Sequence, residues 1–229
     1  MKFYKILNED LSLSQIRDKI FYTGDGNSHL KYFVDGNKEI MGSPNKNIKF
    51  GESELNSNGS ITFRFIMEST KYQDPDHEYR EIKPDLTSLS NRGKASNGYG
   101  NLKSNPSGVY IMEIRVNDFI EKIEYFDLIE DGDFTQQDMK ALLELSESVS
   151  IACSCPSFYL MGGAYWLTVE NASILPCNIK PEYWNSPDLR GETKVCKHLS
   201  MLLQPNVLGF FLNNMGSSAK KQLKDNGYI

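Results

Sequence analysis

Two stretches of the sequence, VSIACSCPSF at residues 149–158 and VCKHLSMLL at residues 195–203, carry the residue types that organise the fold. Together they hold three of the chain's four cysteines and one of its three histidines. These side chains form two close pairs, Cys153 with Cys155 and Cys196 with His198. In a chain of 229 residues with so few cysteines and histidines, two such pairs do not arise readily by chance. They are therefore the strongest candidates for a functional site.

Each pair lies in a different kind of predicted element. The first pair follows a short strand, and cysteines at positions i and i+2 of an extended chain point to the same side. The thiols of Cys153 and Cys155 can therefore reach one metal ion. The second pair begins a predicted helix, where the positive end of the helix dipole favours a thiolate at Cys196. His198 can bind a metal through one ring nitrogen and donate the other to a neighbouring group.

Four cysteine and histidine ligands are the set that a structural zinc ion takes in a closed tetrahedron. We therefore predict one structural zinc ion bound by Cys153, Cys155, Cys196 and His198. A catalytic zinc ion would need an open fourth position, whereas here all four positions are filled. Two alternatives stay open. Cys153 and Cys196 can instead be buried core thiols, and Cys177, in ILPCNIK between the pairs, can replace His198 or one of the cysteines.

The pattern C-x-C followed downstream by C-x-H resembles the SWIM-type zinc finger, in which a β-hairpin supplies the first pair and a short helix the second. The match covers residues 148–204 and includes the proline and the aromatic residue of CSCPSF. The resemblance implies zinc at the same four residues. One departure is that 40 residues separate Cys155 from Cys196, more than such fingers usually have. Fingers with such inserts also look similar to structural proteins of tailed bacteriophages, which implies a component of a phage particle.

The insert between the two pairs is rich in aromatic residues and proline, which is not the composition of a disordered spacer. We expect it to fold back on the site. Its aromatic side chains are of the types that anchor protein interfaces, and core packing explains them equally well. They are Tyr159, Tyr165, Trp166, Tyr183 and Trp184.

The whole sequence predicts an α+β fold in two regions. Residues 1–130 form a mainly antiparallel β region, and residues 131–229 hold a helix, the zinc-stapled β-hairpin and helix module, and a helical tail. Pro205 interrupts the helix of the module before the tail begins. The elements expected in the first region are a strand at 2–7, a helix near 13–21, hairpins at Asp35-Gly36 and Asn58-Gly59, and β segments at 109–116 and 119–129.

Two local patterns make sharper predictions. Apolar residues alternate along ITFRFIM, so Ile61, Phe63, Phe65 and Met67 should share one face on a core. Thr135 has Asp138 three residues on, which is typical of a helix N-cap. The stretch DGDFTQQD begins like a calcium loop but lacks the required glycine and glutamate, so we interpret it as a helix-capping loop.

Residues 86–108 differ from the rest of the chain. They contain no acidic residue, carry Arg92, Lys94 and Lys103, and are rich in glycine, asparagine and serine. Such a composition predicts a long loop, and long loops in compact proteins tend to be functional. It is either a solvated insertion or a basic arm that tracks phosphates, with Tyr99 available to stack on a base.

Composition and charge limit the classes of function. The net charge of −5 argues against a chain whose whole surface coats nucleic acid. The amino-terminal residues lack the pattern of a signal peptide, so we expect none, and no stretch approaches the roughly 18 apolar residues of a membrane span. We therefore expect a cytoplasmic origin, reduced thiols and no membrane partner. The motifs of serine hydrolases, phosphate-binding loops and zinc proteases do not occur, so we expect no enzymatic activity.

These features predict a non-enzymatic, zinc-binding structural or assembly protein that contacts other proteins, in the cytoplasm or in a virion. The alternative is a nucleic-acid-binding protein or a regulatory adaptor that uses the SWIM-like finger. Residues 148–204 carry equal numbers of basic and acidic side chains, so the finger produces no positive field for nucleic acid. The charged residues are Lys180, Arg190, Lys194 and Lys197 with Glu170, Glu182, Asp188 and Glu192.

Overall fold

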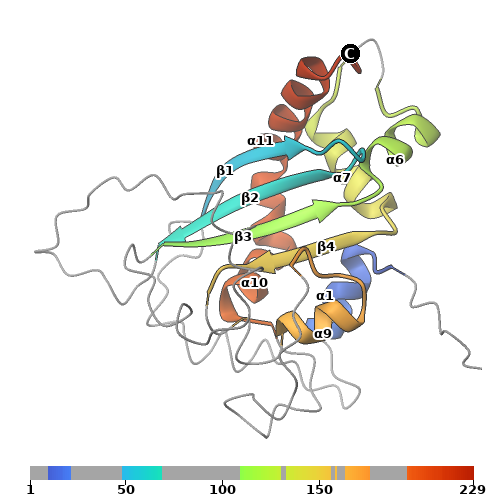
Figure 1. Cartoon of the computed structure of the whole chain (residues 1–229). Coiled ribbons are helices and arrows are strands. Elements are labelled where there is room, and N and C mark those ends of the chain that lie inside the picture. Colours follow the sequence, from blue (N-terminus) through green and yellow to red (C-terminus); the bar gives the residue numbers. More distant parts are fainter. Residues whose placement is uncertain are drawn as a thin grey trace, which may run out of the picture.

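The computed structural model describes residues 10–21, 48–68, 109–129, 133–155, 158, 163–175 and 195–229. These residues form a four-stranded antiparallel sheet with helices packed against it (Figure 1), which confirms the predicted α+β fold. The strands, in their order across the sheet, are β1 (Ile48–Leu55), β2 (Ile61–Glu68), β3 (Val109–Val116) and β4 (Val149–Cys153). The helices are α1 (Leu13–Phe21), α6 (Phe119–Phe126), α7 (Gln136–Leu145), α9 (Gly163–Val169), α10 (Lys197–Leu202) and α11 (Pro205–Asp225).

The sheet joins strands from both of the regions expected from the sequence, since β1 to β3 precede residue 130 and β4 follows it. β4 pairs antiparallel with β3, with Cys153 opposite Met112. On its other side, the Ile151 N–H donates to the Ala172 carbonyl at 2.8 Å, and the Ile174 N–H donates to the Ile151 carbonyl at 3.2 Å. The strand that ends at the first cysteine is therefore held by hydrogen bonds along both of its edges.

The hairpin predicted at Asn58-Gly59 is confirmed, and it connects β1 to β2. Gly59 has φ of 81°, in the left-handed region that glycine enters without steric cost. The side-chain amide of Asn56 donates to the Ser60 carbonyl at 3.1 Å and to the Thr62 hydroxyl at 3.2 Å. Local turn chemistry thus sets the register of the two strands.

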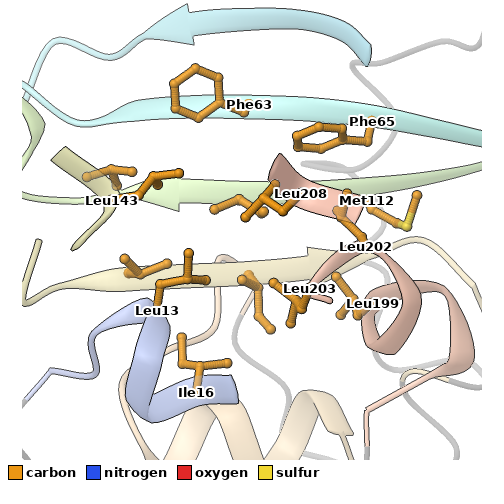
Figure 2. Packing of buried hydrophobic residues seen from close by; sticks show 14 of the residues in the cluster. Leu13, Ile16, Phe63, Phe65, Met112, Leu143, Leu199, Leu202, Leu203 and Leu208 are labelled. Atoms are coloured by element: carbon orange, nitrogen blue, oxygen red, sulfur yellow. The ribbon is translucent and has the colours of Figure 1, made fainter. Parts of the chain in front are cut away.

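The core lies between one face of the sheet and the helices (Figure 1). The alternation predicted for β2 is confirmed, because its four apolar side chains, Ile61, Phe63, Phe65 and Met67, are all buried. Leucines of α10 and α11 lie over Phe65 and Met112 on this face (Figure 2). Burial of one such side chain contributes about 1.5–3 kcal/mol, so this layer is the main source of stability.

The prediction of a second β segment at residues 119–129 is wrong, because the chain forms helix α6 there. Isoleucine, tyrosine and phenylalanine favour strands, but the spacing of the buried side chains is helical. Phe119 and Ile123 lie four residues apart, and both are buried. Asp118, just before the helix, accepts hydrogen bonds from the Ser146 hydroxyl and the Glu147 N–H. Packing against the end of α7 therefore overrides the strand propensity.

The N-cap predicted at Thr135 is confirmed and begins α7. The Thr135 hydroxyl accepts from the N–H groups of Gln137 and Asp138, and the Asp138 carboxylate accepts from the Thr135 N–H at 2.6 Å. This reciprocal capping box satisfies donors that the first helical turn would otherwise leave without partners. The described part of DGDFTQQD, residues 133–138, is thus a helix cap, as the sequence predicted.

Pro205 separates α10 from α11, as predicted, and occupies the first turn of α11. Proline fits that position because its missing N–H would have no helical partner there. Further along α11, the backbone at Gly216 lies against the N-cap of α7. A Cβ added at Gly216 would come within 2.9 Å of the Thr135 carbonyl oxygen. Only glycine therefore allows α11 and α7 to approach so closely.

The face of the sheet opposite the core carries an ion-pair network centred on Arg64. Its guanidinium donates to Glu113 at 2.8 Å, to Glu52 at 2.9 Å and to Glu54 at 2.6 Å. Burial acts to lower the pKa of Arg64, but the hydrogen bonds to the three carboxylates outweigh it and raise that pKa. The network crosses the three adjacent strands β1, β2 and β3 and ties them together.

Several predicted features lie outside the described residues. They are the strand at 2–7, the hairpin at Asp35-Gly36, the loop at 86–108 with Arg92, Lys94, Tyr99 and Lys103, and the side chains of Tyr159, Cys177, Tyr183 and Trp184. Among the helices that the structure describes, none has the length and apolar character needed to cross a membrane.

Candidate metal centre

The two predicted ligand pairs meet where β4 ends and α10 begins. Cys153 is the last residue of β4 and pairs with Met112, a core residue, so its side chain faces the helical layer. Cys155 follows two residues later and is buried on the same side. Cys196 directly precedes α10 with an extended backbone, at φ −65° and ψ 156°, and His198 lies in the first turn of that helix.

The four side chains are close enough to surround one ion. Their ligand atoms all lie within 4.8 Å of one another, and the Cys153 Sγ lies 3.8 Å from the His198 Nδ1. With Zn–S bonds of about 2.3 Å and Zn–N bonds of about 2.0 Å, a tetrahedral zinc ion holds two sulfurs roughly 3.8 Å apart and a sulfur and a nitrogen roughly 3.5 Å apart. The sulfur–nitrogen distance of 3.8 Å is close to this geometry, and ligand atoms 4.8 Å apart would draw together by about 1 Å on binding the ion.

The site is closed to solvent. The exposed fractions are 0% for Cys153, 1% for Cys155, 1% for Cys196 and 5% for His198. Burying four polar groups together is unfavourable unless they bond to one another or to an ion. The set of donors, three thiols and one imidazole, is the chemistry of a soft or borderline metal ion. The residues therefore fit a metal ion that is enclosed by protein ligands on all sides.

The thiols influence one another strongly. Burial raises the pKa of Cys153 and of Cys155, and the neighbouring thiols raise that of Cys153 further. Burial also acts to raise the pKa of Cys196, but hydrogen bonds from Cys153, Cys155 and His198 outweigh it and lower that pKa well below its usual value. Of the three thiols, Cys196 is therefore the one whose charged form its neighbours favour, and it lies next to the start of α10.

Backbone groups near the first pair also contact the site. The Ser154 N–H donates to the Ile111 carbonyl at 2.9 Å, and the Ser154 hydroxyl accepts from the Ile111 N–H at 2.9 Å. The Phe158 N–H donates to the Cys155 carbonyl at 3.1 Å and also favours the charged form of the Cys155 thiol, which acts to lower its pKa. The chain around the two cysteines is therefore held by specific hydrogen bonds on both sides of Cys155.

Two further side chains support the second pair. The ring of Tyr110, on β3, stacks on the imidazole of His198, with 4.5 Å between the ring centroids and 31° between the planes. The Arg17 Nε, on α1, donates to the Leu203 carbonyl at 2.8 Å, at the C-terminal end of α10. A cation at this position interacts favourably with the negative end of the helix dipole. The helix that carries His198 is thus held from the sheet at one end and from α1 at the other.

The structure brings together all four residues that the sequence singled out, and it adds groups that sequence reasoning missed. The short helix expected for the second pair is present as α10. The strand before the first pair, β4, has β3 as its antiparallel partner. Ser154 is recognisable in the sequence, because alternation directs it away from Cys153 and Cys155. Nothing in the sequence pointed to Tyr110 or Arg17, since their contacts with α10 join distant segments.

No protein-family model matches the chain, and no curated protein or solved structure is detectably similar to it.

Proposed function

We propose that Cys153, Cys155, Cys196 and His198 hold one zinc ion and that the chain is a non-enzymatic structural protein stabilised by it. The observation that carries this proposal is the closure of the site by four buried protein ligands. A structural zinc ion takes four such ligands, whereas a catalytic one keeps a position for water or substrate. The agreement with the C-x-C and C-x-H pattern of SWIM-type fingers supports zinc in particular.

When bound, the ion cross-links β4 and α10 through its coordination bonds to the four ligands. These elements are separated in the sequence by the aromatic-rich insert, so the cross-link joins the sheet to the helices that follow it. Around the ion the chain's own residues exclude water and hold the ligands in place. The role we assign to zinc is therefore to fix the carboxy-terminal helices on the sheet.

We propose further that this scaffold serves assembly with other proteins, as a component of a bacteriophage particle. The resemblance of the finger and its insert to phage structural proteins supports this step. Exposed aromatic side chains, the type that anchors interfaces, also support it: Tyr125 is 79% exposed on α6 and Phe210 is 61% exposed on α11. Trp166, by contrast, packs partly buried against the core, which favours a structural role for that residue.

The alternative, a nucleic-acid-binding module, receives no support from the outer face of the described sheet. There Lys49, Arg64 and Arg115 are matched by Glu52, Glu54 and Glu113, so the face has no excess of positive charge. Phosphate binding requires such an excess. Retention on a DNA column that weakens steeply with salt would reverse this preference.

The test of the proposal is the metal content of the full chain purified without added metal. We expect one zinc ion per chain in the wild type and in Cys177→Ser, and none in Cys196→Ser. Cys177→Ser is the matched control, because it removes the one cysteine outside the proposed ligand set. Loss of zinc in Cys177→Ser would show that Cys177 takes the place of one of the four proposed ligands. A wild type without zinc would make the four residues three core thiols and a buried histidine. Mass spectrometry of purified phage particles tests the location.

A further inference from the structure

We propose that strand β3 positions both ligand pairs of the zinc site. Ile111 holds Ser154, and with it the two cysteines of the first pair. The ring of Tyr110 holds His198 so that it binds zinc through Nδ1. The inference rests on the proposed zinc site and concerns how the chain prepares it. Tyr110 and Ile111 are consecutive residues, and side chains alternate along a strand. One strand therefore reaches the two ligand pairs by different means, through a ring on the core face and through the backbone.

The first contact replaces a bond of the sheet. Ile111 and Ser154 stand opposite each other one step beyond the pair Met112 and Cys153. In a regular antiparallel ladder, both N–H groups of such a pair would donate to backbone carbonyls. Here the Ser154 N–H donates to the Ile111 carbonyl at 2.9 Å, but the Ile111 N–H donates to the Ser154 hydroxyl, also at 2.9 Å.

Because the Ser154 hydroxyl takes the place of the backbone carbonyl as acceptor, the chain can leave the strand without losing a hydrogen bond. The hydroxyl satisfies the buried Ile111 N–H while the backbone after Ser154 turns away from β3. Because Ser154 is held by two bonds to β3, the cysteines on either side of it are fixed toward the core. An alanine at this position would keep the bond from its own N–H and leave the Ile111 N–H without an acceptor.

The second contact restrains the histidine ring. The tyrosine ring covers one face of the imidazole at a centroid distance of 4.5 Å, within the range of favourable aromatic pairs. Rotation of the imidazole about its Cβ–Cγ bond would drive its edge into that ring. The imidazole of His198 is thus held with Nδ1 toward Cys153, at 3.8 Å from the sulfur. A zinc ion bound in this arrangement leaves the proton on Nε2.

The matched experiment for the cysteines compares two serines that alternation places on the same side of the chain, Ser150 in β4 and Ser154 directly after its end. Ser154→Ala removes the acceptor for Ile111, whereas Ser150→Ala removes an equally buried hydroxyl that accepts from the Asn117 amide at 2.9 Å. We expect zinc affinity, measured by chelator competition, to fall roughly tenfold to a hundredfold in Ser154→Ala. Ser150→Ala should bind zinc as the wild type does, and Ser154→Thr, which keeps a hydroxyl, should recover most of the loss.

The experiment for the histidine compares Tyr110→Leu with Tyr110→Phe. We expect zinc to dissociate roughly tenfold faster from the leucine variant, and the visible absorption of its cobalt(II) derivative to change. The phenylalanine variant keeps the stacked ring and should match the wild type in both measurements. Long-range ¹H–¹⁵N spectra of the zinc-loaded wild type should show Nδ1 bound to metal and a proton on Nε2.

The outcomes separate this inference from the zinc site itself. A wild-type chain without zinc would remove the site and the inference together. If the wild type binds one zinc ion, but Ser154→Ala and Tyr110→Leu bind it as tightly as Ser150→Ala does, the zinc site stands and the role of β3 is overturned. Metal bound at Nε2 of His198 in the wild type would overturn the role that we assign to Tyr110. If Ser154→Ala does not fold, Ser154→Thr and the Tyr110 pair decide.

Discussion

The Sγ of Cys153 lies 3.8 Å from the Nδ1 of His198, although the two residues are 45 positions apart in the chain. One atom belongs to the end of β4 and the other to the first turn of α10, so the contact joins the sheet to the helical layer. Both residues are buried, and two more cysteines complete the cluster.

Removal of either of these two ligands should release the metal and destabilise the fold. In Cys153→Ser or His198→Ala, three ligands remain, and the free energy of zinc binding, which counts toward folding, is largely lost. We expect a loss of several kcal/mol in the free energy of unfolding, together with loss of zinc. Thermal denaturation and elemental analysis of the same samples check this. Variants that melt like the wild type and retain their metal would show the ligand assignment to be wrong.

Zinc affinity should rise with pH. Burial raises the pKa of Cys153 and Cys155, while the neighbouring thiols and His198 lower that of Cys196. Between these pKa values the metal-free site carries protons on two thiols, and zinc must displace both. Affinity should therefore rise by roughly a hundredfold per pH unit, and zinc-dependent stability is lost as the pH falls. Chelator competition at several pH values measures the slope. A slope near zero would mean that the metal-free site is already fully deprotonated.

Two glycines of α11 should respond in opposite ways to alanine. Gly216→Ala places a Cβ 2.9 Å from the Thr135 carbonyl, so α11 and α7 must move apart, at a cost of about 1–3 kcal/mol. Gly209→Ala meets nothing within 4 Å and should stabilise the helix by about 0.5–1 kcal/mol. Chemical denaturation of both variants checks the pair. Equal effects at the two positions would contradict the close approach at Gly216.

Replacement of Arg64, at the centre of the ion-pair network on the sheet, should lower the free energy of unfolding. Arg64→Met leaves the carboxylate of Glu113, whose side chain is only 5% exposed, without its ion-pair partner. We expect a loss of about 1–3 kcal/mol in the free energy of unfolding, because a buried charge then lacks a hydrogen-bond donor. The double variant Arg64→Met with Glu113→Met should recover part of that loss.

The matched control is Lys140→Met, since Lys140 and Glu144 form an exposed pair at 3.9 Å on α7. Such surface pairs contribute at most about 1 kcal/mol. A loss in Lys140→Met as large as that in Arg64→Met would show that burial is not the reason for the effect.

Features whose physical cause is local could be predicted from the sequence. The hairpin at Asn58-Gly59 and the N-cap at Thr135, with Asp138 three residues on, involve residues only a few positions apart. The same holds within each ligand pair, because alternation along a strand and the start of a helix set where Cys153, Cys155 and Cys196 point. These predictions needed no knowledge of the rest of the fold.

Helix α6 shows where local reasoning fails. Its sequence, FIEKIEYF, is rich in residues that favour strands, and the sequence predicted a β segment there. The structure buries Phe119 and Ile123, four residues apart, and fixes Asp118 to the end of α7. The free energy of these long-range contacts exceeds the small difference in intrinsic propensity. The spacing of four residues between Phe119 and Ile123 is that of a helix face, so the period of the pattern, and not its strand-favouring composition, indicated the helix.

The sequence by itself determined the chemistry of this protein: four donor side chains in two pairs, the alternation that buries one face of β2, and the caps and turns that bound the elements. Only the tertiary structure decided that β4 lies beside β3, that Tyr110 covers His198 and that Gly216 meets Thr135. The physical reason is range. Side-chain direction and turn geometry follow from neighbouring residues, whereas contacts between distant segments are selected by the packing of the whole core.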